Sequence, residues 1–348
     1  MIKKIYLQNF KCFLELEKSL SQLTILTGIN SAGKSSILQA LRIIPRLGDE
    51  IANILPGHGS WNDLECKQSE TGIIKLEVYD EDEKCIKSSY DINASTQEIT
   101  RASGFTSIWR SVANIHYIGA ARLGPQTYLP TQPGMNGRTV GDQGEHVVEF
   151  CKLNAERIVH SELRHPRATG NTFDVQLEAW MGEVSPGVRF QFEVNTQTDT
   201  SWLTVGSSLD VNVHRRPVNV GFGVSYSLPI VATLLAAPPG STILLENPEA
   251  HLHPKGQTRM GELIAYAAMS DVQVIVETHS DHLLDGIRIS AKEKRISTDK
   301  VTIYYFSKDA QDMTQVKAPK LQENGDLSDW PEGFFDQSLI NLSKLAEF

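Results

Sequence analysis

Residues 23–41 of the chain read LTILTGINSAGKSSILQAL, and this stretch indicates how the molecule folds. Gly28–Ser35 fits the pattern GxxxxGK[ST], in which backbone amides of a glycine-rich turn surround a phosphate. The short apolar run Leu23–Thr27 predicts a buried strand before the turn, and Ser35–Leu41 predicts a helix after it. A strand, a glycine-rich turn and a helix N-terminus together make an anion site, because the helix dipole favours negative charge there.

The loop and the start of the helix supply the residues predicted to bind the cofactors ATP and Mg²⁺. Lys34 would reach the β- and γ-phosphates, and the Ser35 hydroxyl would ligate Mg²⁺. The residues predicted to surround the phosphates are Gly28, Asn30, Ser31, Ala32, Gly33, Lys34, Ser35 and Ser36. A chance match in a Gly/Ser turn is the alternative, and the flanking strand and helix argue against it.

Composition sets outer limits on the fold and on the class of protein. A chain of 348 residues has room for one large domain or two modest ones, with ample core. No apolar run approaches the length of a membrane span, and the N-terminal MIKKIYLQNF lacks the apolar region of a signal peptide. The four scattered cysteines are typical of reduced thiols, so we expect a cytoplasmic protein without membrane partners. The net charge of −9 gives no general support for nucleic-acid binding, but it does not exclude a local basic patch.

Hydrophobic patterns predict the elements that flank the loop and those that follow it. Strands are expected at Ile2–Leu7 and Leu14–Leu20, and alternating apolar residues over 72–92 predict a hairpin around an acidic turn. A Gly/Pro-rich loop follows at residues 124–144. The elements expected after it are helices near 144–160 and 173–181 and strands at 188–194 and 202–205.

A second informative block runs from residue 220 to residue 284. It opens with GFGVSYSL, in which Ser225 is a plausible N-cap for the apolar helix SLPIVATLLAA. The predicted strand Ser241–Leu245 ends in ENPEAHLHP, a helix follows at Gly256–Met269, and the strand Val272–Val276 ends in ETHS. This alternation predicts an α/β fold with a parallel sheet whose strand ends carry the site.

These motifs, in this order, resemble ABC-type ATPases of the SMC, RecF and OLD-nuclease branch. GINSAGKSS resembles their Walker A loop, GFGVSYSL lies where their signature motif lies, ILLENPEAHLHP is similar to their Walker B strand and D-loop, and ETHSDHLL to their switch-histidine segment. The resemblance implies an ABC-ATPase head, with a P-loop parallel sheet, a flanking antiparallel β-subdomain and a helical insertion. It further implies that Glu246 holds Mg²⁺ through water, that His279 senses the γ-phosphate, and that Gly221, Gly223 and Ser225 touch the ATP of a second subunit.

The C-terminal residues narrow the resemblance. The segment GDLSDWPEGFFDQ, with ENPEAHLHP and ETHSDH, is similar to a group of stand-alone bacterial ATPases that end in a short domain of unknown function. We therefore expect a head at residues 1–285, with an insertion at roughly 124–216, and a small C-terminal domain at 286–348 packed on the head. Trp330, Phe334 and Phe335 are expected to attach that domain as an apolar staple.

The chain also departs from the family pattern. Most ABC ATPases end the Walker B strand in Asp-Glu, whereas here Glu246 and Asn247 occupy those positions. An amide orients water but cannot accept its proton at neutral pH, so Asn247 predicts slow hydrolysis and a long-lived ATP state, with Glu249, two residues further along, as the candidate to take over as the base. The signature lacks the LSGGQ form of transporters, no sustained heptads predict a coiled-coil arm, and Gln126 is the first candidate for the Q-loop glutamine.

Several functions stay open at this point. The favoured one is a head-to-tail homodimer, formed with ATP, that switches a separate effector such as a nuclease or toxin, in phage defence or DNA repair. A RecF-like ATPase that binds DNA directly is the main rival, and a transporter subunit is less favoured because of the signature. A zinc cluster of four histidines and a serine-hydrolase triad are disfavoured, because the ATPase motifs already account for the histidines and the triad candidates are sequence neighbours. The residues proposed for DNA contact are Arg157, Arg164, Arg167, Arg215 and Arg216, and the four histidines are His251, His253, His279 and His282.

Overall fold

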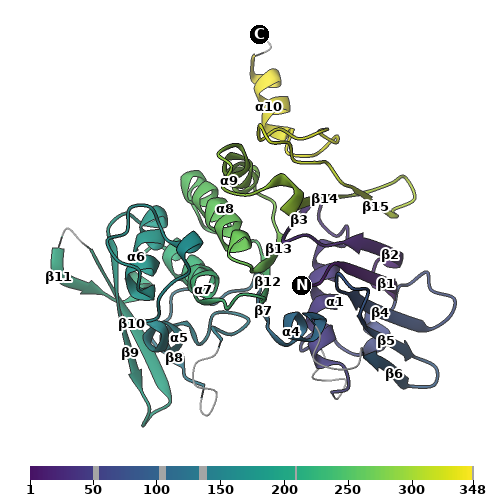
Figure 1. Ribbon diagram of the computed structural model, residues 1–348, viewed down its shortest axis with the longest axis horizontal. Helices are drawn as coiled ribbons and strands as arrows, with labels where there is room; N and C mark the ends of the chain where they lie inside the picture. The colour runs from purple at the N-terminus through teal and green to yellow at the C-terminus, as the bar shows by residue number, and fades with distance from the viewer. Residues whose placement is uncertain (50–54, 102–106, 133–138, 208–209, 347–348) are drawn as a thin grey trace. The chain divides into compact units, whose positions relative to one another are not determined.

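The computed structural model describes residues 1–49, 55–101, 107–132, 139–207 and 210–346 (Figure 1). It divides into two compact units, which we describe separately. Unit 1 comprises residues 1–115, 240–242 and 297–348, and unit 2 comprises residues 116–239 and 243–296. The boundary expected at residue 285 between a head and a small C-terminal domain stays a prediction. No helix in the described ranges is long and apolar enough to cross a membrane.

Unit 1 contains a five-stranded antiparallel sheet in the order β2-β1-β4-β5-β6. The predicted hairpin over 72–92 is confirmed as β4 and β5, and the alternating buried residues Ile74, Leu76 and Val78 give β4 one core face. The strands of this sheet are β1 (Lys4–Phe10), β2 (Phe13–Ser19), β4 (Ile73–Tyr79), β5 (Cys85–Asp91) and β6 (Thr96–Arg101).

The same unit carries the predicted strand–loop–helix of residues 23–41, as β3 (Leu23–Gly28) and α1 (Lys34–Ile43). β3 pairs in parallel with β14 (Val301–Lys308), and β14 pairs antiparallel with β15 (Thr314–Lys317). Every residue from Leu23 to Thr27 is buried, as expected for a parallel strand covered on both faces. The remaining helices and turns of unit 1 are η1 (Ile44–Arg46), α3 (Trp61–Leu64), α4 (Ser107–Ala113), η4 (Thr298–Lys300) and α10 (Gln337–Ala346).

The aromatic residues near the C-terminus pack on the body of unit 1. Phe334 is 1% exposed, and its ring centroid lies 5.3 Å from that of Tyr305 in β14. Trp330 and Phe335 flank Phe334 at 5.5 and 4.9 Å, and the Tyr305 hydroxyl donates to the Glu332 carbonyl at 3.1 Å. Tyr305 itself lies within the domain expected at residues 286–348, so the attachment of that domain to residues 1–285 through these aromatic side chains stays a prediction.

Unit 2 combines buried strands with a layer of helices. β12 (Thr242–Glu246) lies between β7 (Ile115–Ile118) and β13 (Gln273–Glu277), and β12 and β13 are almost wholly buried. α8 (Pro254–Met269) and α9 (Asp281–Lys292) pack side by side (Figure 1), because Gly261 and Gly286 let their backbones approach closely. The other helices and turns of the unit are α5 (Val147–Asn154), η2 (Ser161–Leu163), α6 (Phe173–Val184), η3 (Pro217–Asn219) and α7 (Phe222–Ala236).

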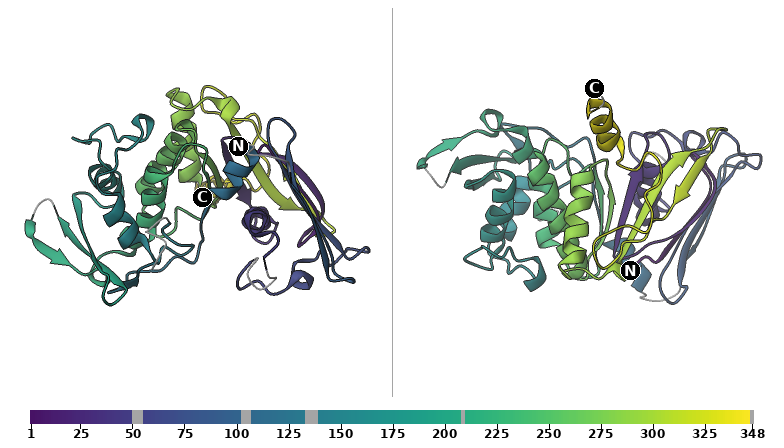
Figure 2. Two further views of the ribbon diagram at one scale, coloured as in Figure 1. Left: turned by 60° about the horizontal axis from the view of Figure 1, so that its bottom comes forward. Right: turned by 90° about the horizontal axis from the view of Figure 1, so that it is seen from above.

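The expected insertion contains strands as well as helices. β9 (Val188–Asn195) and β10 (Thr200–Ser207) form a hairpin, and β10 also pairs with β11 (Asp210–Arg215) and β8 (Leu129–Pro130). α5 and α6 pack against β9, at the edge of unit 2 that Figure 2 shows in teal. Residues 124–144 are largely loop, as predicted, although 133–138 lie outside the described residues.

The predicted start of α7 is wrong. We expect Ser225 as the N-cap, whereas the helix begins at Phe222 with Gly221 in the cap position. Pro229 lies inside this helix and has no N–H to donate to the carbonyl one turn earlier. A helix that began after Ser225 would place the proline near its first turn, where the missing N–H matters less. α7 tolerates the proline because the helix is apolar on nearly all sides and all ten residues from Ser227 to Ala236 are buried.

Candidate functional site

The loop of unit 1 has the backbone of an anion-binding turn. Ser31 and Gly33 have left-handed φ values of 59° and 102°, and α1 begins at Lys34 with no side-chain cap among the described residues. The Ser36 amide donates to the Gly33 carbonyl at 3.1 Å, and a helix start without a side-chain cap suits an anion. The Lys34 side chain is 3% exposed, and its ammonium donates to the carbonyls of Gly28 and Ile29 at 3.1 and 2.8 Å. These features fit a phosphate group, which the ammonium would bind by leaving the two carbonyls.

The two glycines at the ends of the loop are required by their neighbours. A Cβ at Gly33 would lie 2.6 Å from Cys12 Sγ, and a Cβ at Gly28 would collide with the Phe306 backbone. Positive φ at both positions adds to this requirement, since an L side chain is strained there. The loop is therefore held against the β1–β2 turn and against β14, within unit 1.

The other predicted phosphate ligands differ in their surroundings. Asn30 and Ser31 are exposed at the tip of the loop, and Ser35 is half-buried at the start of α1. Ala32 is buried, and its carbonyl accepts from the Thr314 hydroxyl at 3.2 Å. The Ser36 hydroxyl lies 3.9 Å from Cys12 Sγ, so this side chain already has a contact inside unit 1.

In unit 2, a buried arginine organises the end of the Walker B strand. Arg122 is 4% exposed, and its guanidinium donates to the carbonyls of Gly119, Glu246 and Asn247 at 2.8, 2.8 and 2.7 Å. Burial lowers the pKa of Arg122 to about 10, although the charges of Glu249 and Glu246 oppose the shift. The arginine thus remains charged at neutral pH and fixes the path of the loop that follows β12.

The loop turns sharply at Asn247, whose φ is 45°. Its amide donates to the Glu277 carbonyl at 2.9 Å, while its side-chain Oδ1 is buried without a hydrogen-bond partner among the described residues. Asparagine tolerates this left-handed backbone better than glutamate does. Glu246 precedes it, half-buried, and its Oε2 accepts from the Ala120 amide at 3.3 Å.

Glu249 and His279 meet in this unit. Glu249 Oε1 accepts from the His279 amide at 2.8 Å, and Oε2 is buried with no hydrogen-bond partner found in the described part of the chain. Glu249 is only 9% exposed. Burial raises the pKa of Glu249, against the opposing effects of the His279 amide and the Arg122 charge. A carboxylate with an unused oxygen and a raised pKa can accept a proton from a water molecule.

The start of α7 packs on the loop that follows β12 through one glycine and one ring cluster. A Cβ at Gly223 would lie 2.9 Å from the His251 carbonyl, so the helix can approach only with glycine there. The His251 ring lies 4.3 Å from Tyr226 and 5.8 Å from Phe222, and Arg122 lies 5.5 Å from the Tyr226 ring. His251 is therefore engaged in ring packing, which the sequence alone did not indicate.

The remaining predicted site residues lie at the surface. Gly221 is exposed before α7, Ser225 is half-buried in its first turn, and the His279 side chain is exposed after β13. Gln126 is exposed in the loop after Arg122. No sequence pattern singles out Arg122, because a buried arginine cannot be told from a surface arginine without the fold.

Three family models match separate parts of the chain. Residues 1–118 match a family described as "AAA ATPase domain", and residues 173–285 match one described as "AAA domain, putative AbiEii toxin, Type IV TA system". Residues 296–345 match a family described as "Protein of unknown function (DUF3696)". No curated protein sequence matches the chain significantly.

Solved structures of similar fold are SMC heads. An SMC head bound to the C-terminal winged-helix domain of ScpA is 15% identical with a TM-score of 0.58, over 92% of this chain and 98% of that one. The Pyrococcus furiosus SMC head, with an extended coiled coil and bound to the C-terminal domain of ScpA, is 14% identical with a TM-score of 0.58, over 99% of each chain. The Pyrococcus yayanosii SMC head, with a coiled coil and joint, is 11% identical with a TM-score of 0.57, over 99% of each chain. These likenesses and the two AAA matches confirm the fold class and the resemblance to ABC-type ATPases.

Proposed function

We propose that this chain, an ABC-type ATPase with the fold of an SMC head, is a slowly hydrolysing ATP-dependent switch. Support comes first from the unit 1 loop, whose left-handed residues, helix start without a side-chain cap among the described residues, and buried Lys34 suit a nucleotide phosphate. Bound Mg²⁺ would supply charge neutralisation between the phosphates. Ser35 and Glu246 are the residues proposed to hold it, Glu246 through water.

Glu249 is the proposed base, and its unpartnered buried oxygen is the observation that carries the proposal. Asn247 replaces the usual glutamate and cannot take a proton at neutral pH, whereas a carboxylate with a raised pKa can. The hydrogen bond that Glu249 accepts from the His279 amide connects the proposed base to the segment proposed to sense the γ-phosphate. Because Asn247 at the usual glutamate position cannot act as the base, we propose slow hydrolysis and a long-lived ATP state, which suits a clamp or sensor.

The proposed active form is a head-to-tail homodimer with ATP shared between two subunits. The start of α7 supports this proposal, because Gly221 and Phe222 are exposed there and leave a surface for a second subunit. Sedimentation with and without ATP-Mg²⁺ tests it: wild type should dimerise only with nucleotide, and Lys34→Ala should stay monomeric. Ser225→Arg should block the dimer while the matched Ser225→Ala does not. A nucleotide-dependent dimer of the arginine variant would refute the shared site.

The proposed output is control of a separate effector, such as a nuclease or toxin. The family described as an AbiEii toxin, which covers residues 173–285, supports a role in defence. The SMC heads bound to ScpA support a protein partner by analogy. Co-purification from cells, with ATP and with Lys34→Ala as the control, tests this output; an effector retained equally by both proteins would contradict a nucleotide-dependent switch.

Direct DNA binding is the rival, and the structure weakens its candidate residues. Arg157 donates to the Ala236 carbonyl at the end of α7 at 2.6 Å, and Arg164 donates to the Val159 carbonyl at 3.0 Å. Arg167 pairs with Glu183, whereas Arg215 and Arg216 are exposed. Salt-sensitive DNA binding that is lost in an Arg215→Glu, Arg216→Glu variant would favour the rival.

A further inference from the structure

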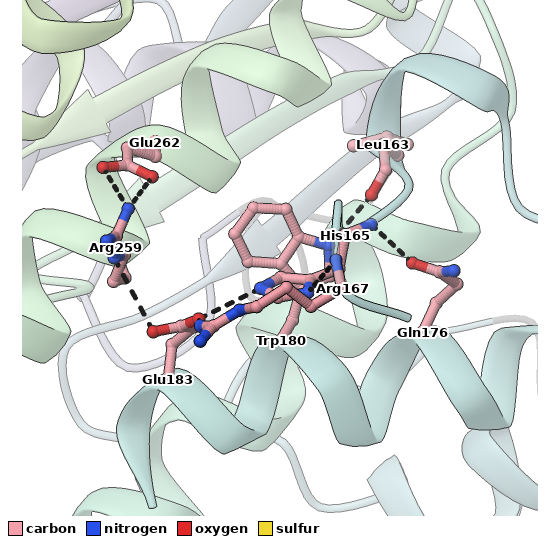
Figure 3. Close-up of polar contacts among 8 residues, drawn as sticks. All are labelled: Leu163, His165, Arg167, Gln176, Trp180, Glu183, Arg259 and Glu262. Atoms are coloured by element: carbon pink, nitrogen blue, oxygen red, sulfur yellow. Dashed lines mark hydrogen bonds and ion pairs between the residues drawn. The ribbon is translucent and has the colours of Figure 1, made fainter. Parts of the chain in front are cut away.

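Unit 2 contains a polar cavity that none of the ATPase motifs explains. Its volume is about 230 Å³, and its walls come from α6, α8, the segment before α6 and the chain just after α9. Figure 3 shows the polar network at its base. The lining residues with charged or aromatic side chains are His165, Arg167, Trp180, Glu183, Lys255, Arg259, Glu262, Tyr266 and Arg295.

A buried histidine fixes one wall of this cavity. The His165 amide donates to Gln176 Oε1 at 2.6 Å, and the ring Nδ1 of His165 accepts from the Arg167 amide at 3.2 Å (Figure 3). Nε2 therefore carries the proton and donates to Glu183 Oε1 at 3.1 Å. Burial lowers the pKa of His165, which keeps the ring neutral. The Trp180 indole donates to the Leu163 carbonyl at 2.9 Å and holds the neighbouring wall.

The two carboxylates of the cavity are committed to arginines. Glu183, whose side chain is 5% exposed, pairs with Arg167 and lies 3.6 Å from Arg259 Nε. Burial would raise the pKa of Glu183, but the His165 hydrogen bond and the two arginine charges lower it overall. Both oxygens of Glu262 accept from Arg259 Nη1, at 2.7 and 2.6 Å. These pairs orient the arginines and leave their other N–H groups for a ligand.

Positive charge exceeds negative charge in the cavity. Lys255, Arg259, Glu262 and Tyr266 follow one another at spacings of four, three and four residues, so one face of α8 presents them all. Arg295 lies 5.4 Å from the Tyr266 ring and pairs with Glu293 at 2.9 Å. The exposed Lys255 ammonium has no ion-pair partner in the described ranges. The three arginines of the cavity pair with glutamates, so among the described residues Lys255 supplies its unpaired positive charge.

We propose that this cavity binds a phosphate group carried by a small molecule, with Lys255, Arg167 and Arg259 as its donors. Guanidinium forks match phosphate oxygens, and a compact ammonium adds a point charge. The cavity is larger than one phosphate group requires, and the remaining volume favours a ligand that carries further atoms, such as a nucleoside monophosphate. A pocket with committed carboxylates on a chain of net charge −9 favours such a ligand over a DNA strand.

Calorimetric titration of the full-length Lys34→Ala protein tests this proposal, because that variant should remove nucleotide binding at the unit 1 loop. The probes are inorganic phosphate, adenosine monophosphate and a short DNA duplex. We expect phosphate or the nucleotide to bind, and Lys255→Glu to weaken binding by about tenfold or more, since a charge-assisted hydrogen bond is lost. Equal affinity for both probes would show that the phosphate group alone is read; tighter binding of the nucleotide would show that the nucleoside contributes.

A matched control separates the cavity from general charge. Lys152 in α5 is also exposed, at 52% of its side chain, and does not line the cavity, so Lys152→Glu should leave the affinity unchanged. Arg167→Gln provides a second test and should also weaken binding, while His165 and Arg259 still contact the buried Glu183. The proposal is overturned if neither small probe binds, if Lys255→Glu acts no more strongly than Lys152→Glu, or if only the duplex binds.

Discussion

Glu249→Gln should increase the stability of the protein while it nearly abolishes ATP turnover. The carboxylate is 9% exposed, and one of its oxygens has no hydrogen-bond partner among the described residues. Removing a buried charge whose second oxygen lacks a hydrogen-bond partner in the described part of the chain should recover about 1–2 kcal/mol of unfolding free energy at neutral pH. The amide oxygen of glutamine can still accept from the His279 amide, so the loop should keep its path.

The pH dependence gives this prediction a sign. Burial raises the folded-state pKa of Glu249 above its ordinary value of 4.5. Between 4.5 and the raised pKa, the folded protein binds more protons than the unfolded chain, so wild-type stability falls as pH rises through that window. The glutamine variant lacks this loss. Its advantage should be smallest below pH 4.5 and should reach a constant value above the folded-state pKa of Glu249.

Urea unfolding at several pH values and steady-state phosphate release measure the two effects. Turnover should fall by about a hundredfold or more, as expected for loss of a general base. Glu178→Gln is the matched control: burial also raises the pKa of Glu178, but its oxygens bind the Phe190 amide and Arg189. That variant should keep turnover. Glu249→Gln with wild-type turnover, or with lower stability at every pH, would refute the reasoning.

Three further predictions concern the backbone and charges around the site. Arg122→Met should cost about 3 kcal/mol in urea unfolding and lower turnover, because the carbonyls of Gly119, Glu246 and Asn247 lose a charged donor; a loss below about 1 kcal/mol would contradict this. Gly286→Ala should destabilise by about 1–3 kcal/mol, because its Cβ would collide with the Thr258 carbonyl, whereas the matched Gly182→Ala in α6 meets no atom and should stabilise by up to about 1 kcal/mol; equal thermal shifts would refute the close helix contact. Asn247→Glu should lose about 1–2 kcal/mol from the left-handed backbone and yet speed phosphate release if a second base helps; a faster variant of unchanged stability would show that the turn relaxes without cost.

Local patterns in the sequence determined much of the fold. The strand–loop–helix of residues 23–41, the hairpin over 72–92 and the buried strands before Glu246 and Glu277 all appear close to their predicted positions. Each is signalled by short-range features of the sequence, namely side-chain periodicity and turn residues. The fold class followed from the order of these elements, and the candidate ATP-binding residues followed from the motifs.

The tertiary structure decided which side chains are buried and what they touch. α7 begins three residues before Ser225, because the packing of its apolar faces outweighs the local defect at Pro229. Arg122, Glu249 and His165 take their roles from partners more than ten residues away in the chain. Burial and charge pairing set the pKa of a group, and both depend on elements that meet only when the chain folds. The sequence therefore determined the positions of the ATPase motifs, and only the packed structure could reveal the buried Glu249 oxygen without a hydrogen-bond partner among the described residues and the cationic cavity of unit 2.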